Sequence, residues 1–442
     1  MKCFFVSLGC PKNLVDSEIM RALLDREGHE ITCSEKDAEV IIVNTCGFIE
    51  SAKEESIETI LEMALNKKTG SCKALIVTGC MAQRYSKDMK KEIPEVDAFI
   101  GTGEFHRITE VLKNVKEHET IELVSDPEYI WRSDMPRLVS TPFYYAYLKI
   151  GEGCSHKCSF CIIPQLRGPY RSRPVKDIVE EARNLAGQGV KEIIIIAQDP
   201  TQYGYDLPEK PQLVTLLKEI EQIEGIRWIR ILYLYPNSIS DELLELIKNS
   251  EKICKYIDLP LQHCEHKILK AMGRKGNKED YLNVIKKIKE KIPDVTLRTA
   301  LIVGFPGETN EHFESLMDFV EKAEFDRLGA FEYSKEEGTE AEKLKGHVSK
   351  KTKKERLHRI MTLQKKISLK KNKSLTGSVQ EVIIENISNK GKYKIQGRTR
   401  RDTPDIDGYI YLLSSDVQPG DIVKARVTGA KEYDLYGEII TD

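Results

Sequence analysis

The chain has 442 residues, of which 40% are hydrophobic and 31% charged, and its formal net charge is −2. This length supports two or three domains with cores of their own, and the near-neutral charge excludes bulk electrostatic attraction to nucleic acid. No apolar run approaches the roughly 18 residues of a membrane span, and the start, MKCFFVSLGCPKN, is too short and too polar for a signal peptide, so we expect a cytoplasmic protein without membrane association.

Short apolar runs alternate with helical patterns over residues 1–116. The runs FFVSL, EVIIVN and ALIVT are followed by helical stretches at 13–27, 49–65 and 81–92. Buried runs that alternate with helices indicate βαβ units, a parallel sheet and right-handed connections. This region is therefore predicted to be a parallel α/β domain.

Three cysteines occupy equivalent places in this region. Cys10, Cys46 and Cys80 each stand at the carboxyl end of one apolar run, where the chain turns into a helix. The carboxyl ends of parallel strands share one edge of the sheet, where ligands bind. Eleven cysteines in a reducing compartment favour metal ligation over disulfides, so we expect these three thiols to lie together around an iron–sulfur cluster.

A looser stretch at 117–141, rich in charge and bounded by Pro142, is predicted to be a linker. From Tyr144 onward a second series of strands and helices begins, with the apolar runs AYLKI, EIIIIA, WIRILYL, YIDLPL, TLRTALIVG and RLGAFEY. Six repeats fall short of the eight of a full TIM barrel. The pattern predicts a partial, open (β/α)6 TIM-like barrel with its chemistry at the carboxyl ends of the strands.

A second group of cysteines follows the first strand of this barrel. Cys154, Cys158 and Cys161 have the spacing C-x3-C-x2-C in one loop. A [4Fe–4S] cluster usually takes four thiolates, and three would leave one iron with an open position, the mark of a reactive metal site. A zinc site with His156 as the fourth ligand is the structural alternative.

Polar residues and glycines mark further strand ends of the barrel. The phrase LIVGFPGET places Gly304 and Pro306 in a turn after an apolar strand, and glycine permits close backbone approach there. Gln198–Asp199 and Gln262–His263 follow two other strands. They are either cofactor or substrate contacts or satisfied polar loop residues.

The last hundred residues comprise a lysine-rich stretch and a region of short strands. Residues 343–373 have helical spacing of apolar positions, which favours a connecting helix with a solvated lysine face over a phosphate-binding surface. Residues 376–442 alternate short strands with Gly and Pro turns, which predicts a small antiparallel β-barrel. The fold class is therefore α/β: an N-terminal parallel domain, a partial barrel and a small C-terminal barrel.

The loop CSHKCSFC resembles the signature of the radical S-adenosylmethionine (SAM) superfamily, and Gly304-x-Pro306-Gly307-Glu308 resembles its adenosine-binding strand end. With the N-terminal cysteines and the C-terminal barrel, the whole chain resembles the methylthiotransferase family. The resemblance implies an N-terminal cluster domain at 1–116, a radical SAM core at 140–370 and a TRAM domain at 373–442.

The same resemblance implies the cofactors and the residues that bind them. Cys10, Cys46 and Cys80 would ligate an auxiliary [4Fe–4S] cluster, and the loop cysteines the cluster that binds SAM. Four strand-end residues would contact SAM: Gly304, Pro306, Gln198 and Gln262. Two SAM molecules would be used, both clusters would face one site between docked domains, and no side chain is assigned as a general acid or base. The other five cysteines are expected to be small buried hydrophobes.

Three phrases resemble the branch of the family that acts on an aspartate β-carbon of ribosomal protein uS12: SLGCPKNLVDSE at 7–18, IAQDPTQYG at 196–204 and GRTRRDTPDIDGYIYL at 397–412. Residues 375–442 carry nine Lys and Arg against eleven Asp and Glu. This balance suits a basic protein partner better than RNA, although the cluster Arg398, Arg400 and Arg401 could still touch phosphate. The alternatives are a tRNA adenosine methylthiotransferase and, from another class, a non-catalytic iron–sulfur carrier.

The expected partners follow from this branch. They are uS12 or the small ribosomal subunit as substrate, and an electron donor such as flavodoxin or ferredoxin. The protein is expected to act as a monomer.

Overall fold

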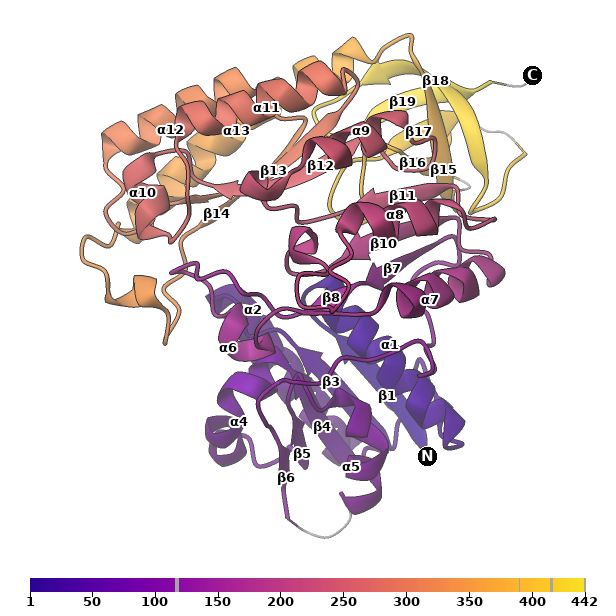
Figure 1. Ribbon diagram of the computed structural model, residues 1–442. Coiled ribbons are helices and arrows are strands. Elements are labelled where there is room, and N and C mark those ends of the chain that lie inside the picture. The colour runs from indigo at the N-terminus through magenta and orange to yellow at the C-terminus, as the bar shows by residue number, and fades with distance from the viewer. Residues whose placement is uncertain (116–118, 389, 414–415, 441–442) are drawn as a thin grey trace.

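The computed structural model describes residues 1–115, 119–388, 390–413 and 416–440 (Figure 1). Its strands form a six-stranded N-terminal sheet, two adjoining three-stranded sheets in the middle of the chain, and a closed C-terminal barrel. Among the described residues no helix is both long and apolar enough to cross a membrane. The predicted domain boundary at residue 116 and the last two residues of the chain lie outside the described residues.

The N-terminal sheet is parallel throughout, with the order β2-β1-β3-β4-β5-β6. Its strands are β1 (Lys2–Ser7), β2 (Glu30–Ile31), β3 (Val40–Thr45), β4 (Ala74–Gly79), β5 (Ala98–Ile100) and β6 (Ile121–Leu123). Its helices are α1 (Pro11–Arg26), α2 (Glu50–Ala64), α3 (Asn66–Thr69), α4 (Cys80–Glu92) and α5 (Ile108–Asn114), with a 3-10 turn at Phe105–Arg107. The central strands β3 and β4 are buried over their whole length, as their continuous apolar runs predict.

The three predicted helices begin and end within two residues of α1, α2 and α4. The prediction missed β2, β5 and β6, because strands of two or three residues carry no measurable apolar period. The predicted linker is wrong at 121–123, since β6 pairs with β5 as the edge strand of the sheet. The prediction for the spare cysteines is confirmed for four of them and wrong for Cys33, which is exposed in the turn that follows the short edge strand β2.

The middle of the chain forms the predicted partial barrel of six parallel strands. The strands are β7 (Tyr145–Lys149), β10 (Glu192–Ile196), β11 (Trp228–Ile231), β12 (Tyr256–Gln262), β13 (Thr296–Val303) and β14 (Arg327–Glu332). Between β11 and β12 the ladder is reduced to the bridge Ile229–Ile253 and a bond of 2.9 Å from the Leu234 amide to the Asp258 carbonyl. The arc therefore continues through all six strands but does not close.

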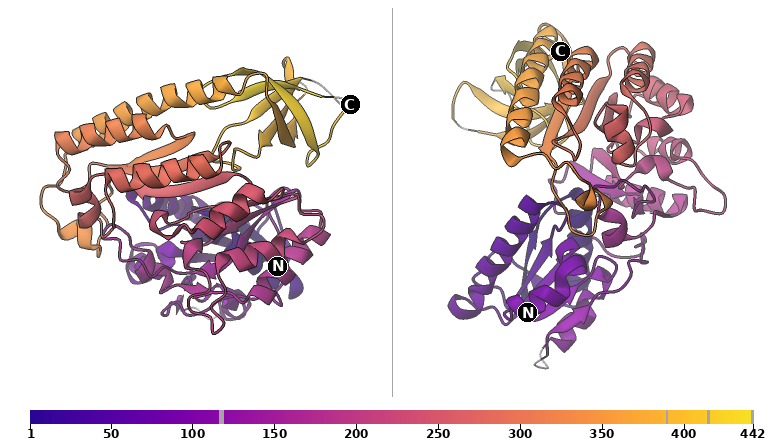
Figure 2. Two further views of the ribbon diagram at one scale, coloured as in Figure 1. Left: turned by 45° about the horizontal axis from the view of Figure 1, so that its top comes forward. Right: turned by 90° about the vertical axis from the view of Figure 1, so that its left-hand side faces the viewer.

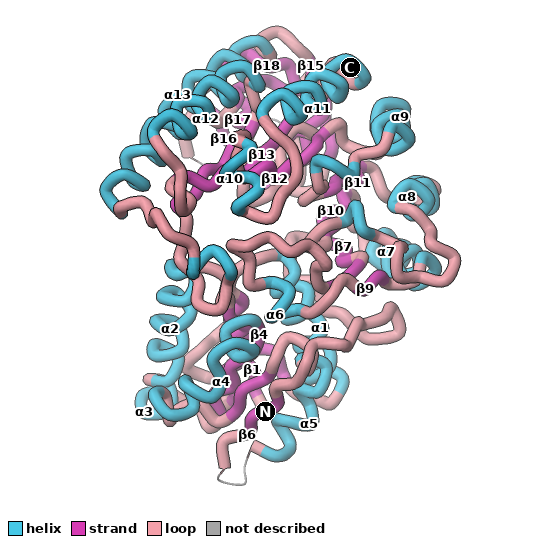
Figure 3. Tube along the Cα trace, turned by 60° about the vertical axis from the view of Figure 1, so that its left-hand side comes forward, coloured by secondary structure: helices cyan, strands magenta, loops and turns pink. Residues whose placement is uncertain are grey.

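Helices cover the outer face of this arc (Figure 3). They are α7 (Val175–Gly187), α8 (Leu213–Glu221), α9 (Asp241–Asn249), α11 (Lys278–Lys291) and α12 (Asn310–Ala323). Short elements lie at the strand ends: β8 (Gly151–Glu152), β9 (Arg171–Ser172), α6 (Ile163–Arg167), α10 (His266–Ala271) and 3-10 turns at Pro200–Gln202, Pro236–Ser238 and Glu340–Lys343. The cysteine loop at 154–161 leads directly into α6.

The long helix α13 (Lys350–Ser374) connects the arc to the C-terminal barrel (Figure 2). Ile360 and Ile367 are buried in the main core, while most of its lysines are exposed. The predicted connecting helix with a solvated lysine face is confirmed. The helix begins at Lys350, later than predicted, because residues 344–349 form a loop after the 3-10 turn at Glu340–Lys343.

The C-terminal barrel closes in the order β15-β16-β17-β19-β18. Its strands are β15 (Val379–Ile387), β16 (Tyr393–Thr399), β17 (Ile410–Leu413), β18 (Ile422–Ala430) and β19 (Leu435–Ile439). The predicted barrel is confirmed, and four of its five pairings are antiparallel, whereas β17 and β19 pair in parallel.

This barrel packs against the amino ends of the arc's strands. Arg398 forms an ion pair with Glu192, the first residue of β10. Trp228, the first residue of β11, donates its indole N–H to Glu381 at 2.8 Å. The C-terminal barrel therefore lies at the end of the arc opposite to the cysteine loop.

Candidate functional site

The three N-terminal cysteines lie at one edge of the sheet, as predicted. Cys10 immediately precedes α1, Cys46 immediately follows β3, and Cys80 is the first residue of α4 directly after β4. The strands β1, β3 and β4 that lead to these cysteines are direct neighbours in the sheet. Topology thus gathers three residues that are far apart in sequence.

Two glycines allow the three cysteine segments to pack closely. Gly9 has φ +86°, and a Cβ at this position would lie 2.8 Å from Cβ and 3.2 Å from Sγ of Cys46. A Cβ on Gly47 would lie 3.0 Å from the carbonyl oxygen of Cys80. A larger residue at either position would push two cysteine segments apart.

Asn13 binds all three segments, although the sequence analysis did not single it out. Its Nδ2 donates to the carbonyl of Leu8 at 3.1 Å and to that of Thr45 at 2.9 Å, just before Cys10 and Cys46. Its Oδ1 lies 3.9 Å from Sγ of Cys80. The side chain is 1% exposed. The feature of the sequence that could have pointed to Asn13 is its place in the first turn of the predicted helix that follows Cys10.

The thiols of this group influence one another. Burial raises the pKa of Cys46 to about 12, and the neighbouring Cys80 and Cys10 add to the rise. Burial also raises the pKa of Cys80. A bound metal deprotonates such thiols, because metal ligation requires the thiolate. One buried and two half-buried thiols on neighbouring segments are a donor set that fits a metal cluster.

The loop cysteines form a similar set. Burial raises the pKa of Cys161 to about 12, with the nearby Cys158 and Cys154 adding to the rise. The loop is held by bonds from the Cys154 amide to the Gly168 carbonyl at 3.0 Å and from the Cys161 amide to the Cys158 carbonyl at 3.1 Å. The three thiols thus sit on a folded loop at the carboxyl end of the barrel strands.

Among the described residues, neither cysteine group forms a site for a single metal ion. In the part of the chain that the structure describes, no three His, Cys, Asp or Glu side chains converge as they would around one metal ion. A [4Fe–4S] cluster takes one thiolate at each of several separate irons, so its ligands stand further apart. The Nε2 atom of His156 lies 2.6 Å from Oδ2 of Asp199, and the ring stacks on Tyr235.

The four predicted SAM contacts lie near the carboxyl ends of their strands in differing surroundings. Gln198 donates to Oε1 of Glu152 at 2.7 Å, and its own Oε1 is buried without a partner among the described residues. Gln262 ends β12 with φ +71°, a strained conformation for a residue other than glycine. An unpartnered acceptor and a strained backbone are features that a ligand site explains.

The two remaining residues, Gly304 and Pro306, form a buried turn. The Gly304 amide donates to Oε2 of Glu308 at 2.8 Å, and a Cβ on Gly304 would lie 2.2 Å from Cγ of Lys353. His263, which follows Gln262, is fully buried with Nε2 3.5 Å from the same Glu308 oxygen. The Gly304 turn and the Gln262 strand end are thus connected through Glu308.

A buried polar cluster joins the two cysteine sites. Lys149 binds the carboxylates of Asp16 in α1 and Glu152 in β8, the latter at 2.8 Å. Arg167 binds Glu152 at 2.9 Å and Asp16 at 3.2 Å, and it also donates to Oδ1 of Asn13. Two cations thus face two carboxylates, which satisfies the requirement that buried charges be paired. The carboxyl edges of sheet and arc dock toward each other, as predicted.

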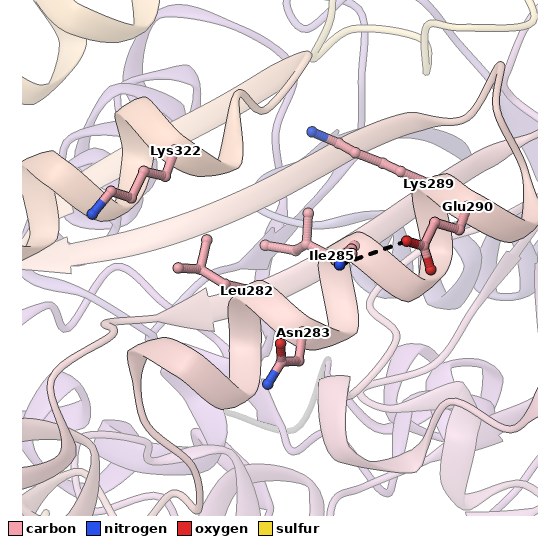
Figure 4. Close-up of a pocket in the computed structure, with 7 residues that line it drawn as sticks. Leu282, Asn283, Ile285, Lys289, Glu290 and Lys322 are labelled. Carbon is pink, nitrogen blue, oxygen red and sulfur yellow. Dashed lines mark ion pairs between the residues drawn. The ribbon is translucent and has the colours of Figure 1, made fainter.

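Two surface cavities lie away from both cysteine groups. One of about 420 Å³ lies between α11 and α12 and is lined by residues such as Leu282, Lys289 and Lys322 (Figure 4). Another of about 470 Å³ is lined by Trp131, by residues 133–137, by Val139 and by part of α7. Neither includes a cysteine or a predicted SAM contact.

Comparison with protein families finds three matching segments along the chain. Residues 2–101 match an uncharacterized protein family, UPF0004, residues 148–320 match the radical SAM superfamily, and residues 376–440 match the TRAM domain. Among solved structures, the radical SAM methyltransferase TsrM from Kitasatospora setae has a TM-score of 0.54 at 14% identity, covering 75% of this chain and 74% of that one. At this identity the likeness concerns the fold alone.

Relatives of much higher identity span the full length. A protein of Pelobacter propionicus named ribosomal protein uS12 methylthiotransferase RimO is 50% identical over 99% of this chain and 98% of its own length. A protein of the same name from Clostridioides difficile is 50% identical to this chain, over 100% of this chain and 99% of that protein. The chain therefore belongs to the RimO family of radical SAM methylthiotransferases.

Proposed function

We propose that this protein adds a methylthio group to the β-carbon of an aspartate in ribosomal protein uS12, with two [4Fe–4S] clusters and two SAM molecules. One observation carries the proposal: two separate groups of three thiols lie on the facing edges of the N-terminal sheet and the barrel arc. The full-length relatives that are named for uS12 support the choice of substrate.

The proposed ligands are assigned by group. Cys10, Cys46 and Cys80 hold the auxiliary cluster, and Cys154, Cys158 and Cys161 hold the cluster that binds SAM. When bound, these cofactors would supply the one-electron chemistry that amino-acid side chains lack. The proposed domains are residues 1–116 for the auxiliary cluster, 140–370 for the radical SAM core and 373–442 for TRAM.

The chain's own contribution is to hold and orient these groups and to exclude water. Asn13 fixes the N-terminal cysteine segments relative to one another. The buried ion pairs of Lys149 and Arg167 fix the sheet against the arc. No side chain is assigned as a general acid or base.

Gln198, Gln262, Gly304 and Pro306 are the proposed SAM contacts. Oε1 of Gln198, which has no hydrogen-bond partner within the described ranges, is placed to accept from an amino or hydroxyl group of a ligand.

Contacts of the C-terminal barrel favour a protein substrate over RNA. Arg398 is fully buried against Glu192 and Glu385, and Arg401 binds Asp326 at 2.8 Å. Arg400 binds Glu381 at 3.3 Å. All three arginines are engaged in ion pairs, so they offer less free positive charge to a phosphate than the sequence alone indicates. We further propose cytoplasmic action as a monomer, reduction by a flavodoxin or ferredoxin, and uS12 as substrate either free or in the small subunit.

The test is an anaerobic assay of the reconstituted protein with SAM and a reductant. Purified uS12, small ribosomal subunits and tRNA are supplied separately, and each product is analysed by mass spectrometry. We expect a methylthio group on one aspartate of uS12 and unmodified tRNA. Methylthiolated tRNA with unmodified uS12 in both forms would refute the proposal.

A further inference from the structure

In the part of the chain that the structure describes, Lys12 is a buried cation without a carboxylate partner. It lies in the first turn of α1, between Cys10 and Asn13, and is 7% exposed. Its Nζ lies 3.5 Å from the ring centroid of Tyr233, and among the described residues it forms neither a hydrogen bond nor a salt bridge. A buried ammonium without an anion is costly, so this arrangement is suited to a ligand that brings a negative charge.

The carboxylates near Lys12 are already occupied. Asp258 accepts from Arg298 and from the Tyr233 amide, both at 2.9 Å. Glu152 is bound by Lys149 and Arg167, which also neutralise Asp16. Because these carboxylates bind other cations, Lys12 is left without a carboxylate partner among the described residues.

Tyr233 lies beside Lys12 and has a strained backbone conformation. Its φ of +68° is unusual for a residue with a side chain, and such strain persists where the surroundings enforce it, often at functional sites. Tyr233 follows β11 at the carboxyl end of the arc, whereas Lys12 comes from the edge of the N-terminal sheet. The aromatic ring and the ammonium thus meet between the two cysteine sites, and the ring orients the cation.

We propose that the Lys12 ammonium binds the side-chain carboxylate of the substrate aspartate and so selects aspartate over asparagine. This inference rests on the proposed function. The carbon to be modified is bonded directly to the carboxyl carbon, so a cation that grips the carboxylate also places the β-carbon. Lys12 stands two residues from Cys10, which puts that carbon near the proposed auxiliary cluster. Lysine suits this role as a compact point charge.

A different role for Lys12 is to balance the charge of the auxiliary cluster through Cys10. The two roles predict different results. If Lys12 balances the charge of the cluster, its loss should change iron retention and the spectrum of the cluster. These changes should be the same whichever substrate is present. A carboxylate anchor would affect binding only of the substrate that carries the carboxylate.

The test measures binding of labelled uS12, with its target residue as Asp or as Asn, to the reconstituted full-length protein by fluorescence anisotropy. Wild type, Lys12→Met and Lys12→Arg are compared. The matched control is Lys289→Met, which removes a half-buried lysine of the outer helix α11 (Figure 4) that donates to the Ala323 carbonyl. Iron content and the electron paramagnetic resonance (EPR) spectrum are recorded for each.

We expect wild type and Lys289→Met to bind the Asp form roughly 10- to 100-fold more tightly than the Asn form, the range of one charge-assisted hydrogen bond. Lys12→Met should bind both forms equally with unchanged iron and spectrum, and Lys12→Arg should keep most of the preference. Equal binding of the two forms by wild type, or an undiminished preference in Lys12→Met, would overturn the inference. Wild type that leaves uS12 unmodified in the mass spectrometric assay would instead overturn the proposed function.

Discussion

The guanidinium of Arg167 donates a hydrogen bond to Oδ1 of Asn13. Arg167 ends the short helix that follows the loop cysteines, and Asn13 lies in the first turn after Cys10. The same Oδ1 lies 3.9 Å from Sγ of Cys80. One amide therefore connects the N-terminal cysteine segments to the segment that carries the loop cysteines, so the two proposed cluster sites are fixed relative to each other.

Replacing Asn13 by Ala should weaken the auxiliary site selectively. The change leaves buried partners of Asn13 unsatisfied, at a cost of about 1–3 kcal/mol for each group. With about eight irons expected for two [4Fe–4S] clusters, anaerobic iron analysis should show a fall toward half. SAM cleavage by the loop cluster should persist. Full iron content in Asn13→Ala would show that the cysteine segments hold their positions without this amide.

Gly9→Ala should have the same selective effect through a steric clash. The added Cβ would lie 2.8 Å from Cβ of Cys46. Gly28→Ala is the matched control, because Gly28 has a similar φ of +81° but nothing within 4 Å of an added Cβ. Both variants carry the backbone strain, and only Gly9→Ala should lose auxiliary iron. Equal iron loss in the two variants would attribute the effect to strain alone.

Two variants, each with the three cysteines of one group changed to Ala, should each lose the iron of one site. Cys10, Cys46 and Cys80 changed together to Ala should remove about half of the roughly eight irons and leave SAM cleavage intact. The same change at Cys154, Cys158 and Cys161 should remove the other half and abolish cleavage. Cys72→Ala, at a buried cysteine that follows no strand, is the control. An N-terminal triple variant with all its iron would place the auxiliary site elsewhere.

The sequence was sufficient to predict the cysteine groups and the main architecture. The N-terminal cysteines follow neighbouring parallel strands, and the rule that such strand ends share an edge holds whatever the packing. The loop cysteines are adjacent in sequence, so their grouping needed no tertiary information. Buried strands such as β3 and β4 are continuous apolar runs, which made the sheet predictable.

The polar residues that connect the sites were not predictable in the same way. Arg167 reaches Asn13 and Asp16, and Arg398 reaches Glu192, across more than a hundred residues of chain. A sequence does not show which residue a charged side chain will pair with, and arginine is usually exposed. The cluster Arg398, Arg400 and Arg401 therefore suggested a phosphate site, whereas tertiary packing makes it the contact between barrel and arc.

Arg398→Met should destabilise the contact between the C-terminal barrel and the arc. It would leave the fully buried Glu192 with Arg230 alone, at 2.8 Å, and removing one partner of a buried pair costs about 3–5 kcal/mol. Chemical denaturation should show the loss, with iron content unchanged. Lys392→Met, at an exposed lysine of the same barrel, should leave the stability unchanged. Equal stability of the two variants would contradict the assigned role.

The same ion pairs predict a dependence of stability on pH. Burial alone would raise the pKa of Glu192, but Arg398 and Arg230 outweigh burial and hold its pKa below the usual value. A carboxyl whose pKa is lower in the folded state contributes stability that is complete above its unfolded pKa of about 4.3 and is lost as the pH falls through its folded pKa. At pH 7 Glu192→Gln should therefore be less stable than wild type, and the gap should close as the solution is acidified below about pH 4. Denaturant midpoints of the two proteins check this. Both are compared after removal of the clusters, because acid dissociates iron–sulfur clusters. A gap that stays constant down to pH 3 would show that the charge of Glu192 does not stabilise the contact.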